Sequence, residues 1–240
     1  MLENEEVRAR IASVRARITD ICRTCGRKDE PLLLAATKTV PVETINFAIR
    51  ECGITAIGEN RVQELLSKYD ELDKSVRLHF IGRLQRNKVK YIVDKVDMIE
   101  SLDSIPLAEE IEKQAAKIGR TIDVLLEVNT GREEQKGGFF PEALEGALEK
   151  IAEFRHIHVC GLMAVSPVCE KNEEISRYFQ ETYQKFIDIS RKKLHNIDMT
   201  VLSMGMTDSY PEAIEQGSTM IRLGSALFGH RDYGETPQNI

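Results

Sequence analysis

The sequence predicts an α/β protein with one domain, a single (β/α)8 TIM-type barrel preceded by an extra N-terminal helix. Three observations lead to this prediction. Short apolar runs alternate with segments of helical periodicity along the whole chain. There are eight such runs, which favours closure into a barrel over an open doubly wound sheet, the alternative that the pattern leaves open. The length of 240 residues is typical of a barrel that forms one domain.

The predicted domain spans residues 1–240, with an N-terminal helix in residues 1–27 and a tail in residues 231–240. Between Val7 and Ile21, apolar residues recur at steps of three and four, the pattern of an amphipathic helix. We expect this helix to flank or plug the barrel. The tail, RDYGETPQNI, carries no periodic pattern.

The eight predicted strands are short apolar runs, each followed by a predicted helix. Helical periodicity is clear after the second run, where Val62, Leu65, Leu66 and Tyr69 fall on one face. The predicted strands are Leu32–Thr37, Ile54–Gly58, Leu78–Gly82, Asp97–Glu100, Ile122–Asn129, Ile157–Ala164, Met199–Ser203 and Met220–Gly224.

Composition and charge exclude several classes of partner. The chain is 42% hydrophobic and 30% charged, which suits a protein with a sizeable core. A net charge of −6 with scattered lysines and arginines disfavours nucleic acid and anionic membranes. The N-terminal segment is charged and no run is long enough to span a membrane, so we expect a cytoplasmic protein.

The five cysteines and five histidines suggest no metal or nucleophilic site. An odd number of cysteines in a chain of this size predicts free thiols in a reducing compartment. Cys22 and Cys25 form a C-x-x-C pair at the end of a predicted helix, without a second pair that would complete a zinc site. His79 is expected to be a hydrogen-bonded core residue. We therefore expect no metal.

Lys38 follows the apolar run PLLLAAT, so it stands at the C-terminal end of the first strand, where barrel enzymes form their sites. Removal of its ammonium from water would favour a nucleophilic amine. On position alone, a lysine that extends from the strand end into water is the commoner case. The residues across the barrel favour the chemical role.

Two short loops near the C-terminus have the composition of a phosphate site. They are residues 203–207, with Ser203 and Gly205, and residues 224–226, with Gly224 and Ser225. Both follow the last two strands, where barrels hold a phosphate with backbone N–H groups and a helix N-terminus. The alternative is that the glycines only form tight turns.

Arg222 lies in the strand TMIRLG, where Ile221 and Leu223 share one face and Arg222 the other. If the apolar pair faces the helices, the guanidinium points into the barrel and needs a partner. An inward carboxylate such as Glu127 and a ligand are equally good partners at this stage.

Taken together, five motifs resemble a known family, the YggS/PROSC-type pyridoxal 5′-phosphate (PLP) homeostasis proteins, which resemble the N-terminal barrel domain of alanine racemase, a fold-type III PLP domain. They cover nearly the whole chain in the family's order. Thr37 replaces the commoner Ser before the lysine, and Leu78 stands where an aromatic residue is usual. The motifs are AATKTVP (35–41), GENRVQE (58–64), HFIGRLQRNK (79–88), GLMAVSP (161–167) and the long segment 202–233.

The resemblance implies a set of cofactor-binding residues. It implies that Lys38 forms a covalent aldimine with PLP and that Asn60 lies close to the cofactor. It further implies that the phosphate is held by Ser203 and the Gly224–Ser225 turn, with Gly205 in the same loop as Ser203, and that Arg222 faces the pyridine nitrogen.

The resemblance also implies a role: a non-catalytic protein that buffers or delivers PLP in the cell, with apo PLP-dependent enzymes as candidate partners and no catalytic residue. We expect a monomer, because no long apolar surface helix is left over. Two alternatives remain. One is a PLP-dependent amino-acid racemase, and the other is a barrel aldolase that uses Lys38 on a phosphorylated sugar without a cofactor.

Overall fold

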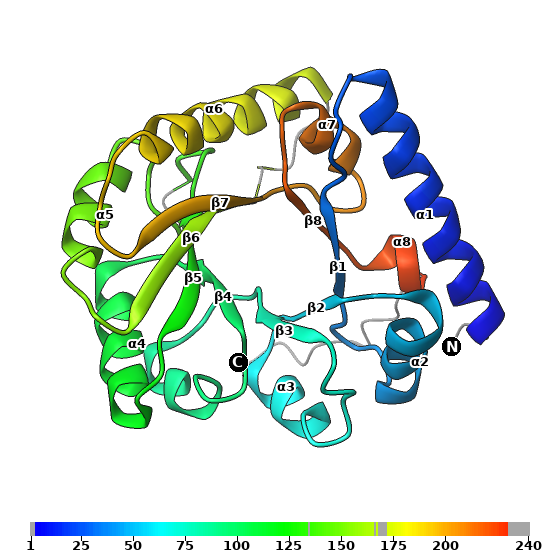
Figure 1. Ribbon diagram of the computed structural model, residues 1–240, viewed down its shortest axis with the longest axis horizontal. Helices are drawn as coiled ribbons and strands as arrows, with labels where there is room; N and C mark the ends of the chain where they lie inside the picture. The colour runs from blue at the N-terminus through cyan, green and yellow to red at the C-terminus, as the bar shows by residue number, and fades with distance from the viewer. Residues whose placement is uncertain (1–2, 134, 166, 168–171, 230–240) are drawn as a thin grey trace.

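The computed structural model describes residues 3–133, 135–165, 167 and 172–229. Eight parallel strands form a closed barrel in the order β1 to β8, with β8 paired to β1 (Figure 1). This confirms the predicted barrel and excludes the open sheet. The predicted tail, residues 231–240, lies outside the described residues. The strands are β1 (Leu32–Ala36), β2 (Ala56–Glu59), β3 (Arg77–Phe80), β4 (Met98–Leu102), β5 (Ile122–Val128), β6 (Ile157–Ala164), β7 (Ile197–Ser203) and β8 (Met220–Leu223).

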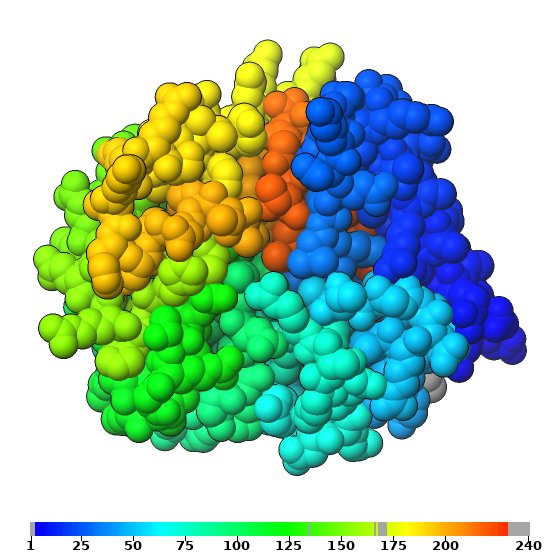
Figure 2. Space-filling view, in the orientation of Figure 1, coloured from blue at the N-terminus to red at the C-terminus, as the bar shows by residue number. Residues whose placement is uncertain are grey.

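Helices surround the barrel (Figure 1). In the space-filling view, blue segments from the N-terminal part of the chain lie beside an orange segment from its C-terminal part (Figure 2). The N-terminal helix begins at Asn4, ends at Thr24 and packs outside the barrel against α2, α7 and α8, so it flanks the fold. None of the helices in the described ranges is long and apolar enough to cross a membrane. The helices are α1 (Asn4–Thr24), α2 (Val42–Cys52), α3 (Val62–Lys68), the 3₁₀ helix η1 (Arg86–Tyr91), α4 (Ile105–Ile118), α5 (Leu144–Ile151), α6 (Asn172–Ser190), α7 (Tyr210–Glu215) and α8 (Ser225–Phe228).

Most strands begin or end one or two residues away from the predicted bounds, and only β6 has both bounds as predicted. Two features have clear local reasons. The second strand begins at Ala56, because Ile54 belongs to the end of α2: its N–H donates to the carbonyl of Ala48 beyond the left-handed Gly53. The segment after β3 is a 3₁₀ helix, in which Val89 is buried; Ile92, three residues later and directly after the helix, is buried on the same side, as one turn of such a helix requires.

The barrel interior is filled by side chains that alternate along the strands. One apolar cluster contains Leu34, Ala56 and Met220, and another contains Met98, Leu125, Cys160 and Met163. Both are separate from the larger core between the strands and the helices. Polar side chains are buried as well, and most of them lie near the C-terminal ends of the strands. This is the end at which barrels place their functional groups.

Candidate functional site

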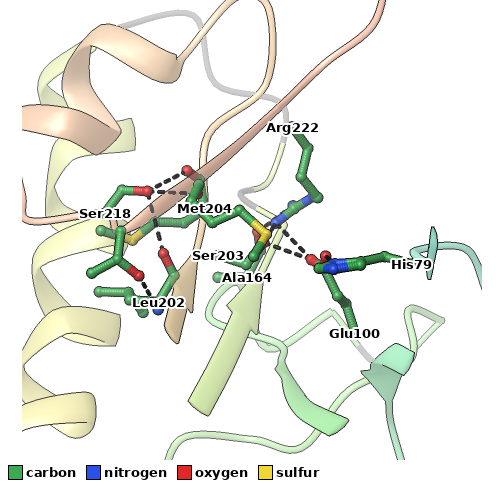
Figure 3. Close-up of polar contacts among 10 residues, drawn as sticks. His79, Glu100, Ala164, Leu202, Ser203, Met204, Ser218 and Arg222 are labelled. Carbon is green, nitrogen blue, oxygen red and sulfur yellow. Dashed lines mark hydrogen bonds and ion pairs between the residues drawn. The ribbon is translucent and has the colours of Figure 1, made fainter. Parts of the chain in front are cut away.

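A network of four buried polar side chains crosses the barrel interior from β3 and β4 to β7 and β8. Figure 3 shows Glu100 between His79 on one side and Ser203 with Arg222 on the other. Glu100 Oε1 lies 2.7 Å from His79 Nδ1, and Ser203 Oγ donates to Glu100 Oε2 over 2.6 Å. Arg222 Nη1 donates to Ser203 Oγ over 2.6 Å, and its Nη2 donates to the carbonyl of Ala164 over 2.9 Å. The expectation that His79 is a hydrogen-bonded core residue is confirmed.

The network fixes the charges of Glu100 and Arg222. Burial raises the pKa of the Glu100 carboxyl, but contacts with His79, Arg222 and Ser203 outweigh burial and hold this pKa below its usual range. Burial lowers the pKa of Arg222, whereas Glu100 and Glu127 oppose that change. A guanidinium titrates so high that it stays charged. Glu100 is the carboxylate at ion-pair distance from Arg222, with Oε2 4.0 Å from Nη1. Glu127, the partner suggested by the sequence, acts on the pKa of Arg222 only through its charge.

The two glycine-containing loops after β7 and β8, which were predicted to hold a phosphate, contact each other. Ser225 Oγ lies 3.1 Å from Thr207 Oγ1, and the N–H of Ala226 donates to the same hydroxyl over 3.3 Å. Ser218 holds the end of β7 in place through the carbonyls of Leu202 and Met204 (Figure 3).

These loops present backbone N–H groups that no other part of the described chain satisfies. Within residues 3–229 as described, the N–H groups of Gly205, Thr207, Gly224 and Ser225 have no hydrogen-bond acceptor. Gly205 has φ +96°, a left-handed conformation that favours glycine, and an added Cβ would lie 2.6 Å from Ala213 Cβ. The loops therefore form a cradle of donors suited to an anion.

Lys38 is half-buried and follows directly after β1. The residue before it, Thr37, is buried and donates through its hydroxyl to Glu59 Oε1 over 2.7 Å. Lys68 Nζ donates to the Thr37 carbonyl and to Glu59 Oε1, each over 2.9 Å, and the N–H of Thr39 donates to Glu64. The backbone on both sides of Lys38 is thus held by charged side chains from β2 and α3.

Asn60 follows β2 and lines a groove of about 1010 Å³ with Arg83 and Asp103. Its Oδ1 is buried and has no hydrogen-bond partner among the described residues. Gly82 packs so closely against it that an added Cβ would lie 2.1 Å from the Asn60 carbonyl oxygen. His79 Nε2 is a second buried atom without a partner in the described structure. Such atoms are costly unless a ligand or water satisfies them.

Three residues of this site were not identified from the sequence. Glu59 and Lys68 hold the backbone at Lys38, and Glu100 joins Arg222 to His79. Burial raises the pKa of the Glu59 carboxyl, and the Lys68 ammonium opposes that rise. The available signal for Glu100 was a charged residue at the end of a predicted strand, Asp97–Glu100.

Residues 10–232 of the chain match the family described as alanine racemase, N-terminal domain. A protein of Aquifex aeolicus named pyridoxal phosphate homeostasis protein is 44% identical over 226 residues, which cover 93% of this chain and 98% of that protein. The chain belongs to the pyridoxal phosphate homeostasis protein family. A relative of the same name from Escherichia coli (strain K12) is 34% identical over 94% of this chain and 97% of its own length.

Solved structures agree with this membership. A crystal structure of an unknown protein from Bifidobacterium adolescentis has a TM-score of 0.90 at 34% identity and covers 95% of this chain and 98% of its own. PipY of Synechococcus elongatus with PLP bound has a TM-score of 0.80 at 29% identity, over 93% of this chain and 100% of PipY. Alanine racemase from Corynebacterium glutamicum, at 15% identity and a TM-score of 0.66, shares the fold; 97% of this chain matches 63% of that one.

The residues at this end of the barrel fit a phosphorylated cofactor, such as the PLP bound in the PipY structure. The donor cradle matches a phosphate, Asn60 Oδ1 offers an unsatisfied acceptor, and Arg222 supplies a buried positive charge. A half-buried amine, Lys38, stands at the same end of the barrel. The set can bind an anion, orient a ring and supply one nucleophilic nitrogen.

Proposed function

We propose that this chain binds PLP at the C-terminal end of its barrel and holds it for delivery without turning over amino acids. The observation that carries the proposal is the cradle formed by the loops 203–207 and 224–226, in which the N–H groups of Gly205, Thr207, Gly224 and Ser225 have no acceptor among the described residues. Family membership and the PLP-bound structure of the relative PipY support it.

In this proposal, the N–H groups of Gly205, Gly224 and Ser225 and the nearby hydroxyls hold the phosphate. Binding through backbone N–H groups costs no side-chain entropy, and these groups can hold a dianion without a lysine side chain. Ser203 fixes the position of the first residue of the phosphate loop, because its hydroxyl donates to Glu100 and accepts from Arg222. Its direct contact with the phosphate stays a prediction.

Lys38 supplies the amine that attaches the cofactor's aldehyde, and Asn60 lies beside the ring. When bound, PLP supplies an electron sink and a carbonyl that amines can exchange. Arg222 faces the pyridine nitrogen as a donor. Because a guanidinium does not give up its proton near neutral pH, it leaves that nitrogen neutral, so the ring stabilises a carbanion poorly. The site therefore favours holding over catalysis.

The test uses the purified full chain with and without Lys38. Wild type should show the visible absorbance of bound PLP, lose it on borohydride reduction, and carry the pyridoxyl group on the Lys38 peptide. Lys38→Ala should lose this absorbance, while the matched control Lys117→Ala, a substitution on the exposed surface of α4, should keep it. A label mainly on another lysine would show that the attachment site is wrong.

Delivery needs a second measurement. PLP-loaded protein is mixed with an apo PLP-dependent enzyme, and recovery of that enzyme's activity is compared with recovery from an equal amount of free PLP. Transfer supports the carrier role. A protein that releases no PLP to the apo-enzyme but racemises free amino acids would favour the racemase, and a chain that never binds PLP would favour the aldolase.

A further inference from the structure

A second cluster of chemically active side chains lies at the N-terminal end of the barrel, away from the proposed PLP site. Asp123, His158 and Cys160 each offer one polar atom, and the three atoms lie within 4.8 Å of one another. His158 Nδ1 is 2.9 Å from Asp123 Oδ1 and 3.4 Å from Cys160 Sγ. No metal-ligand set was expected from the sequence, because Asp123 and His158 lie on different strands and 35 residues apart in the chain.

Strand register explains why these residues meet. Asp123, near the start of β5, pairs directly with His158 on β6. Cys160 lies two residues further along β6, so its side chain is on the same face as His158. The strand is irregular at Cys160, which is skipped in the registers with both β5 and β7. The next residue, Gly161, approaches β7 so closely that an added Cβ would lie 1.7 Å from the Val201 carbonyl oxygen.

We propose that Asp123, His158 and Cys160 bind a zinc ion, with water as the fourth ligand. An imidazole, a thiolate and a carboxylate are the ligands that zinc takes in proteins. Zinc–ligand bonds of about 2.0–2.3 Å place tetrahedral ligand atoms about 3.3–3.6 Å apart. The observed distances of 2.9 and 3.4 Å need adjustments of a few tenths of an ångström.

The surroundings leave room for the ion and give it access. The three residues line a cavity of about 390 Å³ together with Arg77 and Thr200. The side chains of Asp123 and His158 are 37% and 31% exposed, so a metal can enter from solvent and keep a water ligand. The charge of Arg77 in this cavity is opposed at Cys160 by Asp123, which lines the cavity, and by Asp198, which contacts His158.

Asp198 prepares the histidine to act as a ligand. Its Oδ2 lies 3.1 Å from His158 Nε2, on the far side of the ring from Asp123 and Cys160. A carboxylate that accepts the Nε2–H leaves the Nδ1 lone pair for the metal, as outer carboxylates do in many zinc sites. On binding, zinc replaces the proton on Cys160 Sγ and the one between His158 and Asp123, and both protons go to solvent.

Two other interpretations fit the cluster less well. Burial, followed by the charge of Asp123, raises the pKa of the Cys160 thiol to about 12, so without a metal this thiol is a poor nucleophile at neutral pH. A plain ion-pair cluster explains why His158 lies between two carboxylates. It does not explain why a cysteine thiol lies beside the same ring nitrogen. The pair His156–Glu112, 2.8 Å apart, shows what such a cluster looks like without cysteine.

The experiment titrates zinc into the full chain by calorimetry and follows the thiolate-to-metal absorbance of bound Co²⁺. We expect one ion per chain and an absorbance that disappears in Cys160→Ala. His158→Gln should weaken binding at least as much as Asp198→Asn, for which we expect a loss of about 10–100-fold. His156→Gln, the matched control, should bind as wild type does.

Two further variants keep the test decisive. Cys22→Ser/Cys25→Ser removes the competing C-x-x-C pair and should leave zinc binding unchanged. If Cys160→Ala does not fold, Asp198→Asn replaces it, because Asp198 is 75% exposed and its substitution should not affect folding. Wild-type affinity in Asp198→Asn and His158→Gln, or loss of binding in the Cys22/Cys25 variant, would overturn the proposal. Neither the calorimetric titration nor the Co²⁺ absorbance depends on PLP, so the zinc site and the proposed PLP function are tested independently.

Discussion

The Ser203 hydroxyl accepts a hydrogen bond from Arg222 Nη1 over 2.6 Å and is fully buried. The same hydroxyl donates a hydrogen bond to Glu100 Oε2, also over 2.6 Å, so the Ser203 side chain connects a buried cation to a buried anion. The direct separation of the two charges is 4.0 Å, at the limit of an ion pair. The position of the guanidinium therefore depends on Ser203 and on the Ala164 carbonyl.

Ser203→Ala should destabilise the fold by about 1–3 kcal/mol, because Glu100 Oε2 and Arg222 Nη1 each lose the hydrogen bond that Ser203 makes in the buried interior. Chemical denaturation of the PLP-free chain measures the difference. Ser190→Ala removes an exposed hydroxyl at the end of α6 and should change stability by less than about 0.5 kcal/mol. Equal stability of both variants would mean that Arg222 finds other partners.

Stability should fall in acid through Glu100. The pKa of this carboxyl is lower in the folded chain than its usual value, so the folded state binds its proton less readily than the unfolded state does. The resulting stabilisation is present above about pH 4.3 and is lost as the pH falls through the folded value.

The check for Glu100 is the free energy of unfolding measured from neutral to acidic pH. Wild type should be more stable than Glu100→Gln at pH 7, and the difference should shrink as the pH falls below about 4.3. Glu149→Gln, which changes an exposed carboxylate on α5, serves as the control. A constant difference between wild type and Glu100→Gln across this range would contradict the assignment.

Gly205→Ala should weaken PLP binding about tenfold, which corresponds to about 1.4 kcal/mol. The residue has φ +96° and no room for a Cβ against Ala213, so the substitution should shift the donor loop. Gly146→Ala is a matched control, because nothing lies within 4 Å of the Cβ that it adds on α5. Equilibrium dialysis with PLP compares the two, and equal affinities would remove Gly205 from the proposed site.

Racemisation of amino acids should be slower than about 1 s⁻¹, the lower end of typical enzyme rates. The reason is Arg222, which leaves the pyridine nitrogen neutral in the proposed site. Exchange of the α-proton and optical rotation of L- and D-alanine, followed with PLP-loaded protein, measure the rate. Turnover faster than this would favour the racemase over the carrier.

The fold was largely predictable because it depends on repeated local patterns. Each strand is an apolar run, and parallel strands with helices between them leave few arrangements. The direction of Arg222 followed from the alternation in TMIRLG, and its burial is confirmed. The meeting of the loops at Thr207 and Ser225 followed from the order of strands around a barrel.

The partners of the site residues were harder to predict, because they depend on how far side chains reach across strands. Lys68 lies on α3 and extends back to the Thr37 carbonyl, a contact that no spacing in the sequence indicates. Glu100 was placed in a predicted strand, but which strands face each other across a closed barrel cannot be read from one chain. The cluster of Asp123 and His158 depends on strand register, which periodicity leaves open.

The packing of α1 against α7 and α8 joins one helix to two others that are synthesised much later. Its apolar stripe, from Val7 to Cys22, has no complete binding surface until those helices leave the ribosome. At about 5–20 residues per second, translation leaves this stripe exposed for on the order of ten seconds or more. A nascent chain of this protein therefore presents, for most of its synthesis, the kind of apolar helix that chaperones bind.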